Sequence, residues 1–262
     1  IAKIASLYAE YVSIATIADV VSLKDENRIF ARMGIMKIRF ENIPWVDALL
    51  DSSCIKKEKT SSYHIGFIIA PRINAAGRIG TAEVALNLMF SDDYCTALNY
   101  AEILNEENAK RKEIGDKIFK EAVELIENGD YKNKKVIVLA KEHWHQGVIG
   151  ITASRIADIY HKNVFLLSIC GDIAKGSARS VQGFNLYYAL TECCCCLSKF
   201  GGHDMAAGLS LPTDMIEEFD KKVNNYADKI LNADKMIPSI NIDCRLSCEG
   251  SLIKLCREIN KL

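Results

Sequence analysis

Long hydrophobic runs and prolines are scarce in this sequence, and both absences restrict what the chain can be. No apolar stretch approaches the roughly 20 residues that span a bilayer, so we expect no membrane segment. The first residues, IAKIASLYAEYVSIATIADVV, lack the basic start and cleavage pattern of a secretory signal and do not open with methionine. With 262 residues, four prolines and 26% charged residues, the composition predicts a soluble globular chain of one large or two modest domains.

A surplus of charge of one sign is also missing. The net charge of −1 argues against a surface coated with basic residues for nonspecific duplex binding, although it allows a local phosphate groove. Metal-ligand pairs are equally scarce, because Cys244 and Cys248 lack a second pair at the spacing of a zinc site. Four of the ten cysteines, Cys193 to Cys196, are consecutive, and we interpret them as small buried hydrophobic residues in a reducing cytoplasm.

The apolar pattern predicts an α/β chain with one long helix between two parts. A helix followed by a buried strand, SIATIADVV, is expected within the first 23 residues. Residues 92–128 contain no proline and one glycine, Ser91 can cap their start, and Gly129 follows them, so we expect one helix there. Such a helix is too long for one small core, which indicates a connector.

After this helix, strands and helices alternate. The runs KKVIVLA, NVFLLSI, DIAKGSARS and AAGLSL predict strands, and VIGITASRIADIY predicts a helix, which together indicate a sheet covered by helices. Spacing favours Gly201 and Gly202 as the stop of a helix over NLYYALTECCCCLSKF. The tail from SINIDC predicts a new strand and then a helix, the start of a further module.

Four segments combine glycine with polar side chains that suit an anion, and we expect them to form loops: APRINAAGRIG, KEHWHQGVIG, KGSARS and FGGHDMAAG. The second opens a helix, so its free N–H groups could face a phosphate, or it is an ordinary strand-to-helix turn. Trp144 within it could stack on a base or fill a core gap.

Individual residues in these segments have a functional and a structural interpretation. Ser177, Ser180 and the forked donor Arg179 match phosphate oxygens, but a strand residue can also simply face solvent. His203 is either a ligand-binding imidazole or a hydrogen-bonded loop residue. Asp19 lies in an apolar segment, where a carboxylate needs a partner or a metal, yet one carboxylate cannot hold a catalytic metal.

In their order along the chain, ATIADVVSLKDENR, APRINAAGRIG, WHQGVIGITASRI, KGSARS and FGGHDMAAGLSL resemble the RecJ family of single-strand-specific DNA exonucleases, in the DHH phosphoesterase superfamily. The resemblance covers nearly the whole chain. It implies the end of a DHH catalytic domain at 1–90, a long connector helix at 91–129, a DHH-associated substrate-binding domain with a mixed sheet covered by helices at 130–236, and the start of an oligonucleotide-binding barrel at 237–262.

The same resemblance implies an activity and a site. The activity is hydrolysis of single-stranded DNA from the five-prime end with Mn²⁺ or Mg²⁺, in cytoplasmic DNA repair and recombination, with a RecQ-type helicase and a single-strand-binding protein as partners. Asp19 matches the last carboxylate ligand of the metal cluster. The strand- and phosphate-binding cleft would comprise Arg72, Asn74, Arg78, His145, Ser177, Arg179, Ser180, Gly201, Gly202 and His203.

Departures from the family pattern limit what this chain is expected to do. The DHH triplet and the upstream aspartates are absent, and the barrel stops near Leu262. Two-metal chemistry needs more ligands than Asp19 supplies, so we expect the fragment to be inactive or nearly so. Two alternatives stay open: a phosphodiesterase of short oligoribonucleotides or cyclic dinucleotides, and a non-catalytic nucleic-acid-binding module.

Overall fold

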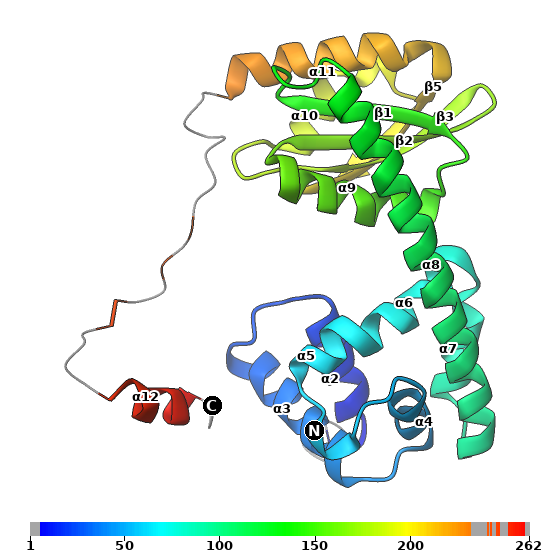
Figure 1. Ribbon diagram of the computed structural model, residues 1–262, viewed down its shortest axis with the longest axis vertical. Helices are drawn as coiled ribbons and strands as arrows, with labels where there is room; N and C mark the ends of the chain where they lie inside the picture. The colour runs from blue at the N-terminus through cyan, green and yellow to red at the C-terminus, as the bar shows by residue number, and fades with distance from the viewer. Residues whose placement is uncertain (1–5, 232–239, 241, 243–244, 247–250, 260–262) are drawn as a thin grey trace.

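The structure is a computed structural model that describes residues 6–231, 240, 242, 245–246 and 251–259. Two bodies of different architecture lie at the two ends of one long helix, α8 (Tyr94–Asn128), as Figure 1 shows. We call residues 6–93 the helical half and residues 129–231 the sheet half. All strands among the described residues belong to the sheet half.

The helical half is a packed set of helices around one apolar core. Its core includes Trp45, Leu49, Ile65 and Leu88, all buried. The elements are α2 (Ala9–Ala18), α3 (Asp25–Phe40), α4 (Pro44–Ser52), η1 (Lys57–Lys59), α5 (Ser62–His64), the π-helix η2 (Ile65–Ile69), α6 (Ala70–Ile79) and α7 (Ala82–Met89).

The segment SIATIADVV is mostly helical rather than extended, so the predicted buried strand is wrong. α2 buries Ser13, Ile14 and Ile17 at helical spacing, and α3 packs against it. A short apolar run does not by itself distinguish a buried strand from a helix, and this contact decides between them. Gly34 of α3 permits the contact, because a Cβ there would lie 2.1 Å from the Cβ of Ser13.

APRINAAGRIG is also helical, so the predicted loop is wrong. α6 continues directly from η2, and Pro71 follows the point where the backbone hydrogen bonds change from the π to the α pattern. The buried Ala75 and Ala76 let the helix pack closely. Because the segment is a helix, Arg72 and Arg78, six residues apart, lie on different faces of it.

The prediction of a long helix between the two parts is confirmed by α8. Its N-cap is Asp93, whose carboxylate accepts a hydrogen bond from the Thr96 N–H at 2.9 Å, rather than Ser91. Residues of its first half, such as Leu104, are buried in the core of the helical half, whereas Ile118 and Ile126 are buried in the core beside the sheet. At about 1.5 Å per residue, its 35 residues span about 52 Å.

The sheet half confirms the predicted α/β class, with a mixed sheet covered by helices. The five strands lie in the order β1-β2-β3-β5-β4; β1 and β2 are parallel and every other neighbouring pair is antiparallel. The elements are β1 (Val136–Glu142), α9 (Gln146–Tyr160), β2 (Asn163–Cys170), β3 (Ile173–Arg179), α10 (Leu186–Glu192), η3 (Cys194–Cys196), β4 (Lys199–Gly202), β5 (Ala206–Pro212), η4 (Thr213–Met215) and α11 (Ile216–Ile230).

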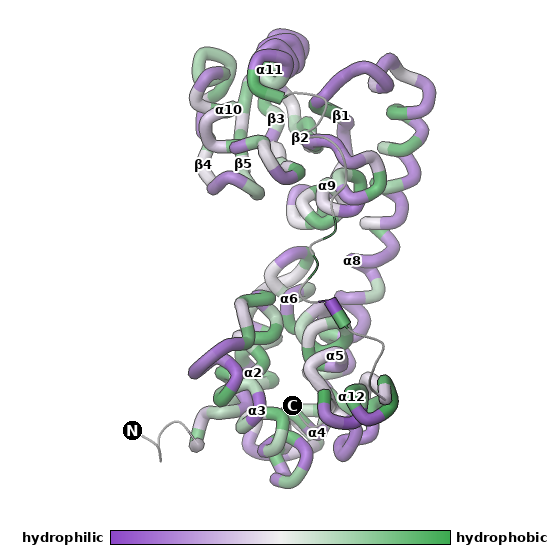
Figure 2. Tube along the Cα trace, turned by 90° about the vertical axis from the view of Figure 1, so that its left-hand side faces the viewer, coloured by the Kyte–Doolittle hydropathy of each residue, from purple (hydrophilic) through white to green (hydrophobic). Residues whose placement is uncertain are grey.

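Strand alternation distributes side chains between two cores, one on each face of the sheet. Val136 and Val138 of β1 belong to the core that includes α10 and α11, and Ile137 and Leu139 belong to the core that includes α8 and α9. Both faces of β1 and β2 are therefore covered, which explains their continuous apolar sequences. The outer turns of α11 are hydrophilic in Figure 2.

Gly201 and Gly202 do not stop a helix, so that prediction is wrong. α10 ends at Glu192, η3 follows, and both glycines belong to strand β4. The interpretation of the cysteine run as buried holds for Cys193 and Cys196, whereas Cys194 and Cys195 are exposed.

The end of the chain is only partly described. The predicted strand near SINIDC, with Cys244 and Cys248, lies almost entirely outside the described residues, while Leu252–Ile259 form helix α12. Among the helices that the structure describes, none has the length and apolar character needed to cross a membrane.

Candidate nucleic-acid interface

The candidate interface begins on the face of the sheet that turns toward α9. On β3 this face carries Lys175, Ser177 and Arg179, because the alternating Ala174 and Ala178 point into the core under α10 and α11. The cross-strand register extends the face over β5 and β4. We define the open sheet face by Lys175, Ser177, Arg179, Lys199, Gly201, Gly208 and Ser210.

Two cross-strand rows give the open sheet face its character. From β3 across β5 to β4, the rows are Lys175–Ser210–Lys199 and Ser177–Gly208–Gly201. The first row places two ammonium groups on either side of a hydroxyl, and the second exposes bare backbone. A hollow of about 390 Å³ lies over the first row and Gly208, and Gln146 and Ile149 of α9 also line it.

Packing does not require glycine at two positions of the second row, Gly201 and Gly208. A Cβ on Gly201 would meet no atom within 4 Å, and one on Gly208 would meet only the Gly176 carbonyl oxygen at 3.9 Å. Gly202 differs, because its φ is 145° and a Cβ there would lie 2.4 Å from the Ala206 carbonyl oxygen. The fold therefore needs Gly202, whereas Gly201 and Gly208 leave room for a ligand to approach the backbone.

Arg179 is the residue of the open sheet face that reaches α9. Its Nε donates to Ser154 Oγ at 3.0 Å, and its Nη1 donates to Ser177 Oγ at 3.3 Å and to the Ala178 carbonyl at 2.7 Å. Burial lowers the pKa of Arg179, and the charge of Arg78 lowers it further. The guanidinium is thus a partly desolvated cation with neutral partners, which suits an anion.

Arg78 and Arg111 complete an arginine cluster with Arg179. Arg78 donates through Nη1 to the Gly147 carbonyl at 3.2 Å, and Arg111 donates through Nη2 to Asn108 Oδ1 at 2.9 Å. Burial and then the charge of Arg78 lower the pKa of Arg111, with Asp116 opposing them. Across the described part of the chain, no ion pair neutralises any of these three guanidinium groups.

Arg72 and Asn74 lie outside the arginine cluster. Arg72 donates through Nη1 to the Ile68 carbonyl at 2.7 Å and through Nε to Asn105 Oδ1 of α8. It therefore clamps α6 to α8, and burial lowers its pKa. Asn74 is exposed and lines a separate, mainly apolar cavity of about 350 Å³ with Tyr11 and Trp45.

The loop before α9 has few free donors for a phosphate. His145 is the N-cap of α9, and its Nδ1 accepts from the Gly147 N–H at 3.2 Å. The N–H groups of Val148 and Ile149 donate to the His145 carbonyl. Trp144 is buried and donates from Nε1 to Glu121 Oε2 at 2.8 Å, so it fills the core rather than presenting a ring to a base.

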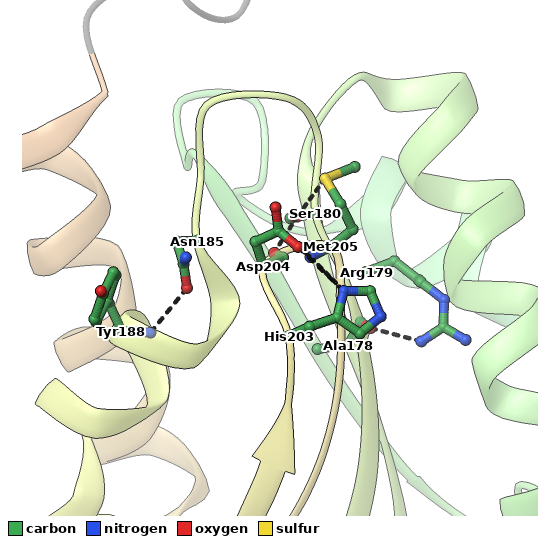
Figure 3. A network of polar contacts seen from close by, with 8 residues as sticks. All are labelled: Ala178, Arg179, Ser180, Asn185, Tyr188, His203, Asp204 and Met205. Carbon is green, nitrogen blue, oxygen red and sulfur yellow. Dashed lines mark hydrogen bonds and ion pairs between the residues drawn. The ribbon is translucent and has the colours of Figure 1, made fainter. Parts of the chain in front are cut away.

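His203 lies on the exposed turn between β4 and β5, at the Arg179 end of β3 (Figure 3). Its Nδ1 lies 3.1 Å from Asp204 Oδ1, and the Met205 N–H donates to both side chains. Ser180 is buried and donates from Oγ to the Asp204 carbonyl at 2.8 Å. Ser180 therefore anchors the turn, and His203 is presented on it.

Asp19 is an exposed residue at the C-terminus of α2 rather than part of a buried strand. Its side chain makes no hydrogen bond or ion pair with the described residues, and Val20 after it adopts a left-handed φ of 57°, a strained value for a β-branched residue. No group of three or more His, Cys, Asp or Glu side chains in the described ranges could share a metal ion. The residues present therefore do not fit a Mn²⁺ or Mg²⁺ site by themselves.

Sequence reasoning missed Lys175, Lys199, Gly208 and Arg111. Lys175 alternates with Ser177 and Arg179 on one strand, so strand periodicity could have identified it. Lys199 and Gly208 join the site only through strand pairing. Arg111 lies in the polar middle of α8, and no local signal distinguishes it from the charged residues around it.

Comparison with known proteins gives consistent results for sequence and structure. A DHHA1 domain matches residues 133–229. The single-stranded-DNA-specific exonuclease RecJ of Bacillus subtilis (strain 168) is 36% identical over 252 residues, covering 95% of this chain and 32% of that protein.

Two crystal structures of RecJ from Thermus thermophilus, in complex with Mg²⁺ and with Mn²⁺, superpose with a TM-score of 0.77 at 32% identity. They cover 85% and 86% of this chain, and the chain covers 34% and 33% of theirs. The chain thus spans about a third of the length of these relatives. It is a homologue of RecJ over that span, with a DHHA1 domain in its sheet half.

Proposed function

We propose that this chain supplies the strand- and phosphate-binding cleft of a metal-dependent exonuclease that hydrolyses single-stranded DNA from the five-prime end. The supporting observation is the arginine cluster, Arg78, Arg111 and Arg179, beside the glycine-lined open sheet face. Arg78 repels both Arg111 and Arg179, and all three guanidinium groups have neutral hydrogen-bond partners. A bound phosphate would stabilise them, because it forms charge-assisted hydrogen bonds with guanidinium groups.

Roles within the cleft follow from position. Arg179, with Ser177 beside it, binds a phosphate between β3 and α9, and Arg78 binds the same or the next phosphate. Lys175 and Lys199 hold the strand over the open sheet face, where Gly201 allows it to approach the backbone. His203 contacts the strand at the far end of this face. Arg72, His145, Ser180 and Gly202 support the cleft through the fold, and Asn74 lies outside it.

Catalysis needs groups beyond those of the described residues. Asp19, exposed and without a partner among them, would contribute one carboxylate to a Mn²⁺ or Mg²⁺ site. A single carboxylate does not hold such an ion, because these cations take several oxygen ligands. The chain by itself is therefore expected to bind strands and not cleave them. In the cell, a RecQ-type helicase and a single-strand-binding protein would act with the exonuclease in DNA repair and recombination.

The test is fluorescence-anisotropy titration of a five-prime-phosphorylated single strand, first in EDTA and then in Mn²⁺. We expect binding without metal, and Arg179→Ala to weaken it by the roughly 1.5–3 kcal/mol of a charged hydrogen bond. His203→Ala should weaken it less, because the imidazole is exposed. Arg32→Ala, an exposed arginine on α3 outside the cleft, is the matched control and should leave affinity unchanged.

Two results would contradict the proposal. If Arg179→Ala and wild type bind the single strand with equal affinity, the arginine cluster is not part of the binding site. Strand cleavage that follows the purified chain through EDTA stripping and Mn²⁺ readdition would show that the chain catalyses without further ligands. A preference for dimers and trimers over long strands would favour a short-oligonucleotide phosphodiesterase instead.

A further inference from the structure

Three aromatic rings form an exposed shelf in the helical half, where α5 passes into η2. Tyr63 and Phe67 are 61% and 72% exposed, with ring centroids 5.0 Å apart and planes tilted by 31°. The His64 ring meets Tyr63 edge-on at 5.9 Å, and its Nδ1 lies 2.8 Å from Ser61 Oγ. We call Tyr63, His64 and Phe67 the aromatic shelf.

The core of the helical half does not use the shelf. In the π-helix η2, Ile65 and Ile69 are buried in this core, while Phe67 between them points outward. A π-helix is rare and is frequently found at functional sites. Phe67 is therefore available for a contact outside the core of this half.

One continuous run of helix joins the shelf to the arginine cluster. Tyr63 lies in α5, and the exposed Phe67 and Arg78 lie in η2 and α6, which follow α5 without a break in the helix. Phe67 and Arg78 are about 16 Å apart along the axis. Figures 1 and 2 both show α5, α6 and α9 in succession. Arg78 connects the last two, because its Nη1 donates a hydrogen bond to the Gly147 carbonyl oxygen of α9.

We propose that the aromatic shelf stacks bases of the single strand whose phosphates bind the arginine cluster, an inference that rests on the proposed function. Every base has a π-face, so stacking on Tyr63 and Phe67 tolerates any sequence. At the axial rise of a stacked strand, about 3.4 Å per nucleotide, a length of about 16 Å holds about five nucleotides. A strand must therefore be long enough to reach the shelf as well as Arg78 and Arg179, so we expect affinity to rise with strand length.

The experiment compares the full chain with Tyr63→Ala/Phe67→Ala in anisotropy titrations of labelled (dT)12, (dT)4 and a twelve-residue abasic strand. We expect the double variant to weaken (dT)12 binding about tenfold or more, since each stacked base contributes substantially. The salt dependence should stay unchanged, because no phosphate contact is lost. The abasic strand should bind weakly and equally to both proteins.

Matched controls separate stacking from folding. Phe90→Ala removes another exposed phenylalanine of the helical half and should leave (dT)12 affinity unchanged. Tyr63→Phe keeps the ring and should retain wild-type affinity. Circular dichroism melting of each variant checks that the fold is intact.

The outcomes for the shelf and for the cleft are distinguishable. If wild type binds (dT)12 and Arg179→Ala weakens it, but Tyr63→Ala/Phe67→Ala binds like Phe90→Ala, the shelf proposal fails and the cleft stands. The shelf proposal also fails if the double variant changes only self-association, measured by sedimentation. If wild type binds no strand, the proposed function and the shelf fail together.

Discussion

The helical half and the sheet half share α8 but differ in how completely they bury apolar side chains. In the sheet half, Phe165, Phe184 and Phe219 are at most 2% exposed, whereas Phe40, Phe67 and Phe90 of the helical half are 72%, 72% and 76% exposed. Strand register constrains a sheet to two faces, and helices cover both faces of β1 and β2. Helices packed pairwise carry no such constraint, so the helical half leaves apolar surface available for contacts.

The largest expected effect tests whether the two cores are independent. Phe165→Ala empties a fully buried site where the ring packs edge-on against Phe219 at 5.3 Å, and should lower the free energy of unfolding of the sheet half by about 3–5 kcal/mol. Trp144 lies in a core of the sheet half and Trp45 in that of the helical half. Single-tryptophan variants therefore report each half during urea unfolding.

We expect the Trp144 transition to move to lower urea concentration, and the Trp45 transition to move much less. Equal shifts of the two transitions would show that the halves unfold as one cooperative unit. The prediction that the two cores are independent would then be wrong.

A second substitution should affect the helical half instead. Gly34→Ala places a methyl group 2.1 Å from Ser13 Cβ and 2.3 Å from the Ala9 carbonyl oxygen, so α2 and α3 must separate, at about 1–3 kcal/mol. The control is Gly77→Ala on α6, whose added Cβ would meet nothing within 4 Å and should stabilise the helix by about 0.5–1 kcal/mol. Urea unfolding measures the stability of both variants. If Gly77→Ala is destabilised as well, close packing of α2 and α3 is not the cause of the lower stability of Gly34→Ala.

The smallest effect concerns pH and the attachment of α8 to the sheet half. Hydrogen bonds from Trp144 and Lys141 to Glu121 lower the pKa of this carboxyl below its usual value of 4.5. A depressed folded-state pKa contributes stability that is present above pH 4.5 and is lost as the pH falls through the lower value. We expect a loss of less than about 1 kcal/mol, because the carboxylate is partly solvated.

Urea unfolding monitored by Trp144 between pH 6 and pH 3 measures this contribution. Glu121→Gln should flatten the pH dependence of the sheet half and leave that of the helical half, monitored by Trp45, unchanged. If the unfolding free energies of Glu121→Gln and wild type depend on pH in the same way, Glu121 is not the source of the pH dependence.

Prediction from sequence succeeded where the pattern is long or alternates. The long helix, β1, α9, β2, β3 and β5 were each identified from periodicity and flanking residues. It was wrong for the helical SIATIADVV and APRINAAGRIG segments and for the glycines of β4. In each case the local pattern permits two structures, and packing against α3, η2 or β5 selects one.

The residues of the candidate site show the same division. Arg179 and Ser177 were predicted because their chemistry suits phosphate, and the structure places both on one face of β3. Arg72 has the same chemistry as Arg78, yet it clamps α6 to α8, because the helix turns these two side chains to different faces. Side-chain chemistry alone does not distinguish them.

The sequence by itself determined the α/β class, the long connecting helix and the residue types suited to phosphate, because periodicity, capping and side-chain chemistry are local properties. Only the tertiary structure decided which cations share a site. Arg78, Arg111 and Arg179 come from three separate elements, and the repulsion of Arg111 and Arg179 by Arg78 exists only once α6, α8 and β3 meet around α9. Electrostatic interaction depends on distance in space, which the order of residues along the chain does not specify.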